Sequence, residues 1–167
     1  MRSKFLVVIL GIVGLIVVGC DSKQVYSTYQ TVPSKWHKDS VKTFKLIPPD
    51  TIKPYNLFIT LRNTSEYKYN NLFVIAELNY PNGKVIKDTL EYRMAAPNGE
   101  LLGEGFSDVK ENKLWYKGYE SPFVFNESGE YVFKVQHAMR QNGNIAGDEF
   151  LEGITDIGFR VEKVDNN

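Results

Sequence analysis

Apolar and polar residues alternate over short stretches through most of the chain, and this period of two is typical of half-buried β-strands. The clearest stretch is Tyr55–Arg62, where Tyr55, Leu57, Ile59 and Leu61 would share one face of a strand. The alternation and the abundance of strand-forming residues predict about eight strands: Val41–Ile47, Tyr55–Arg62, Leu72–Tyr80, Val85–Met94, Lys113–Lys117, Pro122–Asn126, Glu130–Met139 and Ile154–Val161.

Several segments between or within these strands carry more specific signals. Leu72–Tyr80 is apolar on both faces near its middle, which predicts a central strand that is covered on both sides. Pro81-Asn82-Gly83-Lys84 follows it, and because Asn-Gly tolerates positive φ, it predicts a tight hairpin to the next strand. Ala95–Asp108 is predicted as a Gly-rich structured loop or short bulged strands, and Phe150–Gly153 as a helical turn.

Short strands at this spacing, with turn residues between them and no amphipathic helix, predict an all-β fold. We expect an antiparallel β-sandwich with jelly-roll-like connections, and a β-barrel is the alternative. The domain is expected to span residues 35–163, and residues 164–167 to form a short tail.

The first 20 residues have a different pattern. Arg2 and Lys4 precede the uncharged apolar run Phe5–Val18, which is shorter than the roughly 20 residues that a membrane-spanning helix needs. This arrangement fits a secretory signal peptide over residues 1–19. The final Val17-Val18-Gly19-Cys20 resembles the lipobox of bacterial lipoproteins, which implies cleavage before Cys20 and a diacylglyceryl group on its thiol. The alternatives are a plain signal peptide followed by an incidental cysteine and an uncleaved anchor.

Cys20 is the only cysteine in the chain, so it cannot form a disulfide within the chain, and a role at the cleavage site explains it. Residues 20–34 are then predicted to be an acylated N-terminus and polar tether that could reach up to about 45 Å from the membrane. Asp21 is the only acidic residue directly after Cys20. An acidic run there would resemble a surface-export signal of Bacteroidota lipoproteins, so its absence favours a periplasm-facing protein.

Composition adds limits on size and partners. Removing 19 of the 167 residues leaves 148, which suits one domain with a core. Arg2 and Lys4 are lost with the signal peptide, so 18 basic residues remain against 20 acidic ones, a formal charge of about −2. The chain has no basic stripe that would indicate nucleic acid, and nothing beyond the lipid indicates affinity for a membrane.

The sequence predicts no catalytic residue, cofactor or metal site. His37 and His137 lie 100 positions apart without ligand spacing, and there is no G-x-S-x-G nucleophile elbow. A glycosidase needs two carboxylates at a defined separation in space, which proximity in sequence does not establish. Solvated strand faces and loops therefore explain the acidic residues better, namely Asp88, Glu91, Asp108 and Glu111.

Four aromatic residues could contact a partner protein or stack on a glycan: Trp36, Trp115, Tyr116 and Tyr119. The alternative is that they fill the core. Since successive strand residues point to opposite faces, we expect either Trp115 or Tyr116 in the core and the other exposed.

A possible modification site lies in a Pro-rich loop. Asp50-Thr51-Ile52 resembles the Asp, Ser or Thr, aliphatic pattern of periplasmic O-glycosylation in Bacteroidota. Two other matches exist, but one of them, at Asp88-Thr89-Leu90, lies inside a predicted strand. Thr51 is therefore the preferred candidate for O-glycosylation.

Longer motifs are specific enough to indicate a family. They include Tyr55-Asn56-Leu57-Phe58-Ile59, Asp88-Thr89-Leu90-Glu91-Tyr92, Asp108-Val109-Lys110-Glu111-Asn112-Lys113-Leu114-Trp115-Tyr116 and Gly153-Ile154-Thr155-Asp156-Ile157-Gly158-Phe159-Arg160. With shorter motifs between about Tyr29 and Lys163, they resemble the gliding-motility lipoprotein GldH family of Bacteroidota. Ala96-Pro97 and residues 118–121 match least well.

The resemblance implies a cell-envelope lipoprotein that the gliding apparatus requires, and this apparatus is linked to type IX secretion. It implies envelope proteins as partners and no known catalytic residue, cofactor or substrate. The leading hypothesis is therefore a non-enzymatic, membrane-tethered component of the gliding or secretion machinery. A glycan-binding sandwich and a hydrolase are the alternatives.

Overall fold

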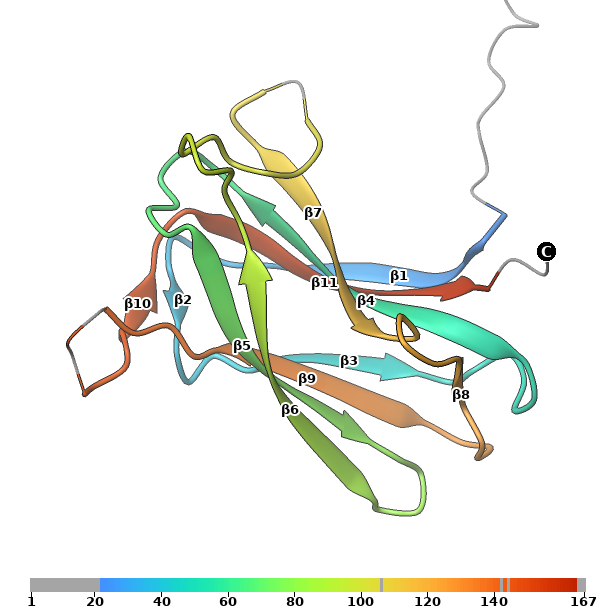
Figure 1. Ribbon diagram of the computed structural model, residues 1–167. Coiled ribbons are helices and arrows are strands. Elements are labelled where there is room, and N and C mark those ends of the chain that lie inside the picture. The colour runs from blue at the N-terminus through green and yellow to red at the C-terminus, as the bar shows by residue number, and fades with distance from the viewer. Residues whose placement is uncertain (1–21, 106, 142, 144, 165–167) are drawn as a thin grey trace, which may run out of the picture.

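The computed structural model describes residues 22–105, 107–141, 143 and 145–164 (Figure 1). Within these residues, no helix is long and apolar enough to cross a membrane. The strands of the described part are β1 (Gln24–Thr31), β2 (Trp36–His37), β3 (Lys42–Leu46), β4 (Pro54–Asn63), β5 (Asn71–Asn79), β6 (Val85–Arg93), β7 (Lys110–Lys117), β8 (Phe123–Val124), β9 (Tyr131–His137), β10 (Phe150–Leu151) and β11 (Ile154–Lys163).

The long strands pair in a nested order. β5 pairs with β6, β4 with β7, β3 with β9 and β1 with β11, all antiparallel. The pairings of β11 with β4 and of β9 with β5 join them into two sheets, with the orders β1-β11-β4-β7 and β3-β9-β5-β6, and β8 adds to β4. This winding of a long hairpin into two sheets is a jelly roll. The predicted sandwich is confirmed, and in the described residues the strands form separate sheets rather than one closed barrel.

The two sheets pack through alternate side chains of their facing strands. In β9, for example, Tyr131, Phe133 and Val135 are buried while the residues between them are half-exposed. Phe133 stacks on Phe159 of β11 with ring centroids 4.2 Å apart, and Phe44 of β3 packs against both rings. Because burial of a large aromatic side chain contributes roughly 1.5–3 kcal/mol, this cluster is a main link between the sheets.

A short third sheet joins β2 to β10 (Figure 1). Phe150 pairs with His37 and Leu151 with Trp36, so the helical turn predicted for Phe150–Gly153 is wrong. The segment is a strand because it pairs with β2. Its partner lies more than 100 positions away in the sequence, and a local pattern does not reveal such a pairing.

Part of the predicted tether forms a strand, β1. The tether assigned to residues 20–34 is wrong for residues 24–31, because they pair with β11 along their length. Tyr26 packs against Phe159 with ring centroids 6.0 Å apart, which ties this strand to the core. Its polar, aperiodic sequence reflects an edge position in which side chains from Val25 to Gln30 are only partly buried.

The hairpin and the position of β5 follow the sequence. Tyr80 N donates to Lys84 O over 2.8 Å, and Gly83 has a φ of 88°, as the Asn-Gly turn predicts. β5 lies between β9 and β6, so it is an interior strand as predicted. Its second face is covered less than expected, because Phe73 and Ile75 are only half-buried on the outer side of the sheet.

A glycine in β11 permits a close approach of three strands, and replacing it should destabilise the fold. A Cβ on Gly158 would overlap Thr60 Oγ1 of β4 and lie 2.7 Å from Thr28 O of β1. Gly158→Ala should therefore lower the free energy of unfolding by about 1–3 kcal/mol in a denaturant titration. Gly147→Ala, where the nearest atom would be 3.4 Å away, is the control and should have little effect. Equal stability of the two variants would contradict this account.

Stability should also depend on the buried imidazole of His137. Its Nε2 donates to Trp36 O over 2.9 Å, while Nδ1 is buried without a partner among the described residues. Burial lowers the pKa of His137 below its usual value of about 6.5, so the unfolded chain takes up a proton before the folded protein does. The free energy of unfolding should be fully retained above pH 6.5 and fall as the pH drops through the lowered pKa. Denaturant titrations across this range should show a smaller decline in the free energy of unfolding for His137→Gln than for the unchanged protein. The control His37→Gln should show the full decline.

Candidate interaction surface

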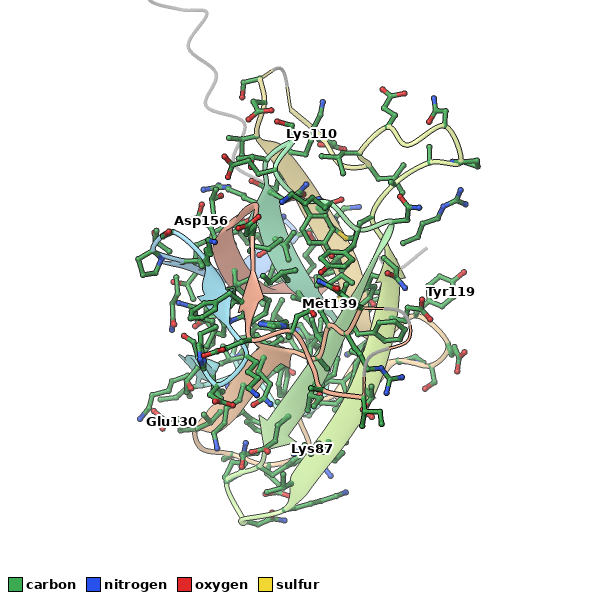
Figure 2. The ribbon with its side chains drawn as sticks, turned by 90° about the vertical axis from the view of Figure 1, so that its left-hand side faces the viewer. Lys87, Lys110, Tyr119, Glu130, Met139 and Asp156 are labelled. Carbon is green, nitrogen blue, oxygen red and sulfur yellow. The ribbon has the colours of Figure 1, made fainter. Side chains whose placement is uncertain are left out.

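Trp115 and Tyr119 form an exposed aromatic pair at the end of β7. Their side chains are 39% and 75% exposed, and their ring centroids lie 5.4 Å apart in an edge contact. Trp115 lies against the buried ring of Phe58 in β4, with centroids 4.4 Å apart, and Lys113 Nζ lies 4.7 Å from the centre of the same ring. Figure 2 shows Tyr119 at the periphery of the molecule. Because these rings lose little conformational freedom on binding, they suit a contact with a partner.

Gly118 places Tyr119 beside Trp115. Its φ of +104° belongs to the left-handed region that glycine adopts at low cost, and it turns the chain directly after β7. A Cβ at this position would lie 2.6 Å from Asn56 Oδ1 and 2.9 Å from Tyr55 O, so the turn packs closely on β4. The glycine thus lets two aromatic residues four positions apart meet at one surface.

The pair is also fixed to the opposite sheet. Tyr92 of β6 donates its hydroxyl to Trp115 O over 2.6 Å, and Lys117 Nζ lies 2.9 Å from Asp88 Oδ2. Burial raises the pKa of Tyr92, and burial together with nearby Asp88 raises the pKa of Tyr116, so both phenols stay neutral and keep their protons. These contacts connect the edge strands of both sheets behind the aromatic pair.

A shallow hollow of about 560 Å³ adjoins the pair. Its lining combines apolar side chains with a few polar ones. The apolar ones include Leu90 from β6, Pro122, and Phe123 at the start of β8, and the polar ones include Lys117 and Glu120. Apolar walls with few polar groups are typical of sites that bind a side chain or a small ligand. We call Trp115, Tyr119, Leu90, Pro122 and Phe123 the aromatic surface.

Of the four aromatic residues that the sequence indicates, the structure brings two to this surface. Tyr116 is only 8% exposed and packs against Phe133 in the core, as the alternation with Trp115 predicts. Trp36 is 1% exposed and donates its indole N–H to Ser40 O over 2.8 Å. The prediction of a partner or glycan contact is therefore wrong for Trp36, whose ring is enclosed by the protein. Tyr116 is mostly in the core but also contributes to the lining of the hollow, so a contact through it stays a prediction.

The other predicted positions lie away from the aromatic surface. Thr51 is in the loop between β3 and β4 and is partly exposed, and its glycosylation stays a prediction. Gly19 and Cys20, the predicted cleavage and lipidation positions, lie outside the described residues.

The acidic residues that resemble a glycosidase pair have separate structural partners. Asp88 pairs with Lys117, Glu111 lies 2.9 Å from Arg62 Nε, and Glu91 accepts from Asn71 over 2.7 Å. Asp108 accepts from the backbone N–H of Ser65 over 3.3 Å. Among the described residues, no three His, Cys, Asp or Glu side chains are placed to hold a metal ion.

A second, larger hollow of about 930 Å³, which the sequence did not predict, lies on the outer face of the other sheet. Phe73 and Ile75 of β5 contribute apolar lining, and Tyr69 donates its hydroxyl to Asp148 Oδ2 over 2.6 Å at its margin. The signal in the sequence was the apolar run in the middle of β5. This run predicts a strand covered on both sides, whereas its outer face borders this hollow.

Sequence comparison finds close relatives of this chain. The family model described as "GldH lipoprotein" matches residues 24–161. A curated protein of Christiangramia forsetii, "Gliding motility lipoprotein GldH homolog", is 52% identical over 166 residues, which cover 99% of this chain and 100% of that protein. "Gliding motility lipoprotein GldH" of Flavobacterium johnsoniae is 47% identical over 157 residues, or 94% of this chain and 96% of that protein.

Solved structures are similar only at a distance. "Structure of infectious bursal disease virus Gx strain" is matched with a TM-score of 0.35 and 15% identity, over 89% of this chain. This chain spans 34% of that longer one. A likeness at this level carries no information about function.

Proposed function

The chain belongs to the GldH lipoprotein family, and we propose that it is a membrane-anchored, non-enzymatic component of the cell envelope that gliding motility requires. The observation that carries this proposal is the identity of about half of its residues with two proteins named gliding motility lipoprotein GldH or its homolog, over nearly their whole lengths. Its partners are envelope proteins of the gliding machinery and the type IX secretion machinery linked to it.

The anchor is Cys20, whose thiol carries the lipid. Cleavage after Gly19 makes this residue the new N-terminus. Two or more acyl chains hold a protein stably at a membrane, whereas one chain binds only marginally. The apolar run before Cys20 and the absence of any other cysteine from the sequence support this assignment. The domain faces the periplasm, which is consistent with the lack of an acidic run after Cys20.

The aromatic surface is the site at which a partner docks. Trp115 and Tyr119 are large, exposed and held in place by Phe58 and Gly118, and such aromatic residues dominate the energetics of many interfaces. Because Trp115 lies near the end of β7 and Tyr119 in the turn that follows, an envelope protein can bind both at one edge of the sandwich while the lipid holds the chain at the membrane.

A glycan-binding lipoprotein is the second candidate, since a Trp–Tyr pair can also stack on sugar rings. One observation favours it: the pair adjoins a shallow hollow with both apolar and polar lining. The two functions differ in what the same residues should bind, so one set of variants separates them.

Loss of the lipid anchor should abolish function without altering the fold. In cells that lack the native gene, Cys20→Ala should accumulate as an uncleaved precursor, incorporate no labelled palmitate and fail to restore gliding. Ser22→Ala, which leaves the Val17–Cys20 motif intact, should restore all three. Palmitate incorporation by Cys20→Ala would contradict the assignment of the anchor, and gliding of cells without the gene would contradict the proposed role.

The aromatic surface should be needed for partner binding. A photoreactive amino acid at position 119 should crosslink to envelope proteins, and Trp115→Leu in the same chain should reduce the yield about tenfold, as expected for a loss of roughly 1.4 kcal/mol. Leucine keeps Phe58 covered, so the unfolding transition should change little. A photoreactive residue at Ile145, which is 98% exposed elsewhere on the molecule, is the matched control.

Polysaccharide arrays provide the competing readout. Binding to an array that is lost in Trp115→Leu and Tyr119→Ala, together with no protein crosslink at position 119, would contradict the protein-docking role and favour the glycan-binding alternative.

A further inference from the structure

Two isoleucines are strongly exposed in the loop that joins β3 to β4. Ile47 is 73% exposed and Ile52 is 83% exposed. Isolated exposed apolar residues are common, but these two occupy one short loop with Pro48 and Pro49 between them. The loop therefore carries an apolar surface that the domain itself does not cover.

The loop has a defined shape that holds Ile52 outward. Asp50 Oδ1 accepts hydrogen bonds from the backbone N–H groups of Ile52 and Lys53, over 3.0 Å and 2.7 Å. Asp50 Oδ2 accepts one from the hydroxyl of the buried Tyr55 over 2.6 Å. The hydrogen bond from Tyr55 is the main cause that lowers the pKa of Asp50, so the carboxylate stays charged and keeps these bonds. Ile52 is therefore exposed because these hydrogen bonds fix the conformation of the loop.

The loop lies at the end of the sandwich where β1 begins. Lys163 N donates to Lys23 O over 2.8 Å, and Val164 N donates to Pro54 O over 3.5 Å, so the start of β1, the end of β11 and the residue after the loop are neighbours. Figure 1 shows the β3–β4 connection and the start of β1 at the same end of the molecule.

The chain length between the anchor and β1 fixes the distance to the membrane. β1 starts at Gln24, four positions after Cys20. A fully extended chain of that length spans about 14 Å, far less than the longer tether that the sequence alone indicates. This end of the domain must therefore stay close to the surface into which the Cys20 acyl chains insert.

We propose that the 47–53 loop inserts Ile47 and Ile52 into the lipid–water interface beside the acylated Cys20, as a second contact with the membrane. The proposal rests on acylation of Cys20, which belongs to the proposed function. The apolar tips would bury hydrocarbon at the boundary, and Lys53 at the end of the loop can extend its ammonium group to the lipid headgroups.

This contact would give the domain one orientation on the membrane. A single lipid attachment at Cys20 would allow the domain to rotate about its anchor, whereas two contacts at one end would restrict that rotation. The aromatic surface would then face along or away from the membrane in a fixed direction, where a partner could reach it.

Fluorescent labelling of the mature lipoprotein tests the contact. Because acylation blocks the Cys20 thiol, Ile52→Cys would carry the only free thiol and could take an environment-sensitive fluorophore. The mature protein, purified from membranes, is reconstituted into vesicles of phosphatidylethanolamine and phosphatidylglycerol that contain nitroxide-labelled lipid. We expect a blue shift of the emission and quenching by the nitroxide at position 52, and the same for Ile47→Cys.

Ile145→Cys is the matched control, since Ile145 is 98% exposed and lies in the loop between β9 and β10. Its label should show neither the blue shift nor the quenching. If the protein floats with the vesicles and positions 47 and 52 behave as position 145 does, the loop contact is overturned while the anchor stands. If the protein does not float with the vesicles, the acylation is overturned, and the proposal with it.

Glycosylation of Thr51 would also contradict the contact between the 47–53 loop and the membrane. A glycan between Asp50 and Ile52 would hold the loop away from the hydrocarbon, so the two assignments exclude each other. An intact mass equal to that of the acylated polypeptide supports the membrane contact, and an added glycan mass located at Thr51 overturns it.

Discussion

The contact of Phe133 with Phe159 is the interaction on which the arrangement of the molecule depends. It joins β9 of one sheet to β11 of the other through stacked rings 4.2 Å apart. β11 is the last long strand, and it lies between β1 and β4 in its sheet. Gly158, next to Phe159, leaves room for Thr60 and for the backbone of β1. The core therefore determines where the first strand of the domain can lie.

The position of β1 has consequences for function. A first strand paired with the last one brings both ends of the described chain to the same end of the sandwich (Figure 1). Since β1 begins four positions after Cys20, only a few residues separate the proposed membrane anchor from the core. The 47–53 loop occupies the same end, and the aromatic surface lies at the edges formed by β6 and β7. The proposed membrane-facing end and the proposed lateral docking surface thus depend on the same winding of the chain.

The alternation of apolar and polar residues predicts the positions of the strands better than it predicts which strands pair. The hairpin at Asn82-Gly83 and the assignment of one of Trp115 and Tyr116 to the core depend on local geometry, and both agree with the structure. The tether and the helical turn at Phe150 were wrong, because β1 and β10 gain their hydrogen bonds from strands more than 100 positions away. Propensity is weak at such edges, and pairing decides the conformation.

The sequence by itself determined the period of the strands, the turn residues and the family, because these depend on residue identity and on neighbours a few positions apart. It also carried the lipobox-like motif, whose acylation stays a proposal. Only the tertiary structure decided which aromatic residues are exposed, since burial depends on what the opposite sheet and its loops cover. Trp36 and Trp115 are the same residue type, yet one is enclosed near His137 and the other lies at the surface on Phe58. Burial is a property of the packed chain, and no local pattern at either tryptophan specifies it.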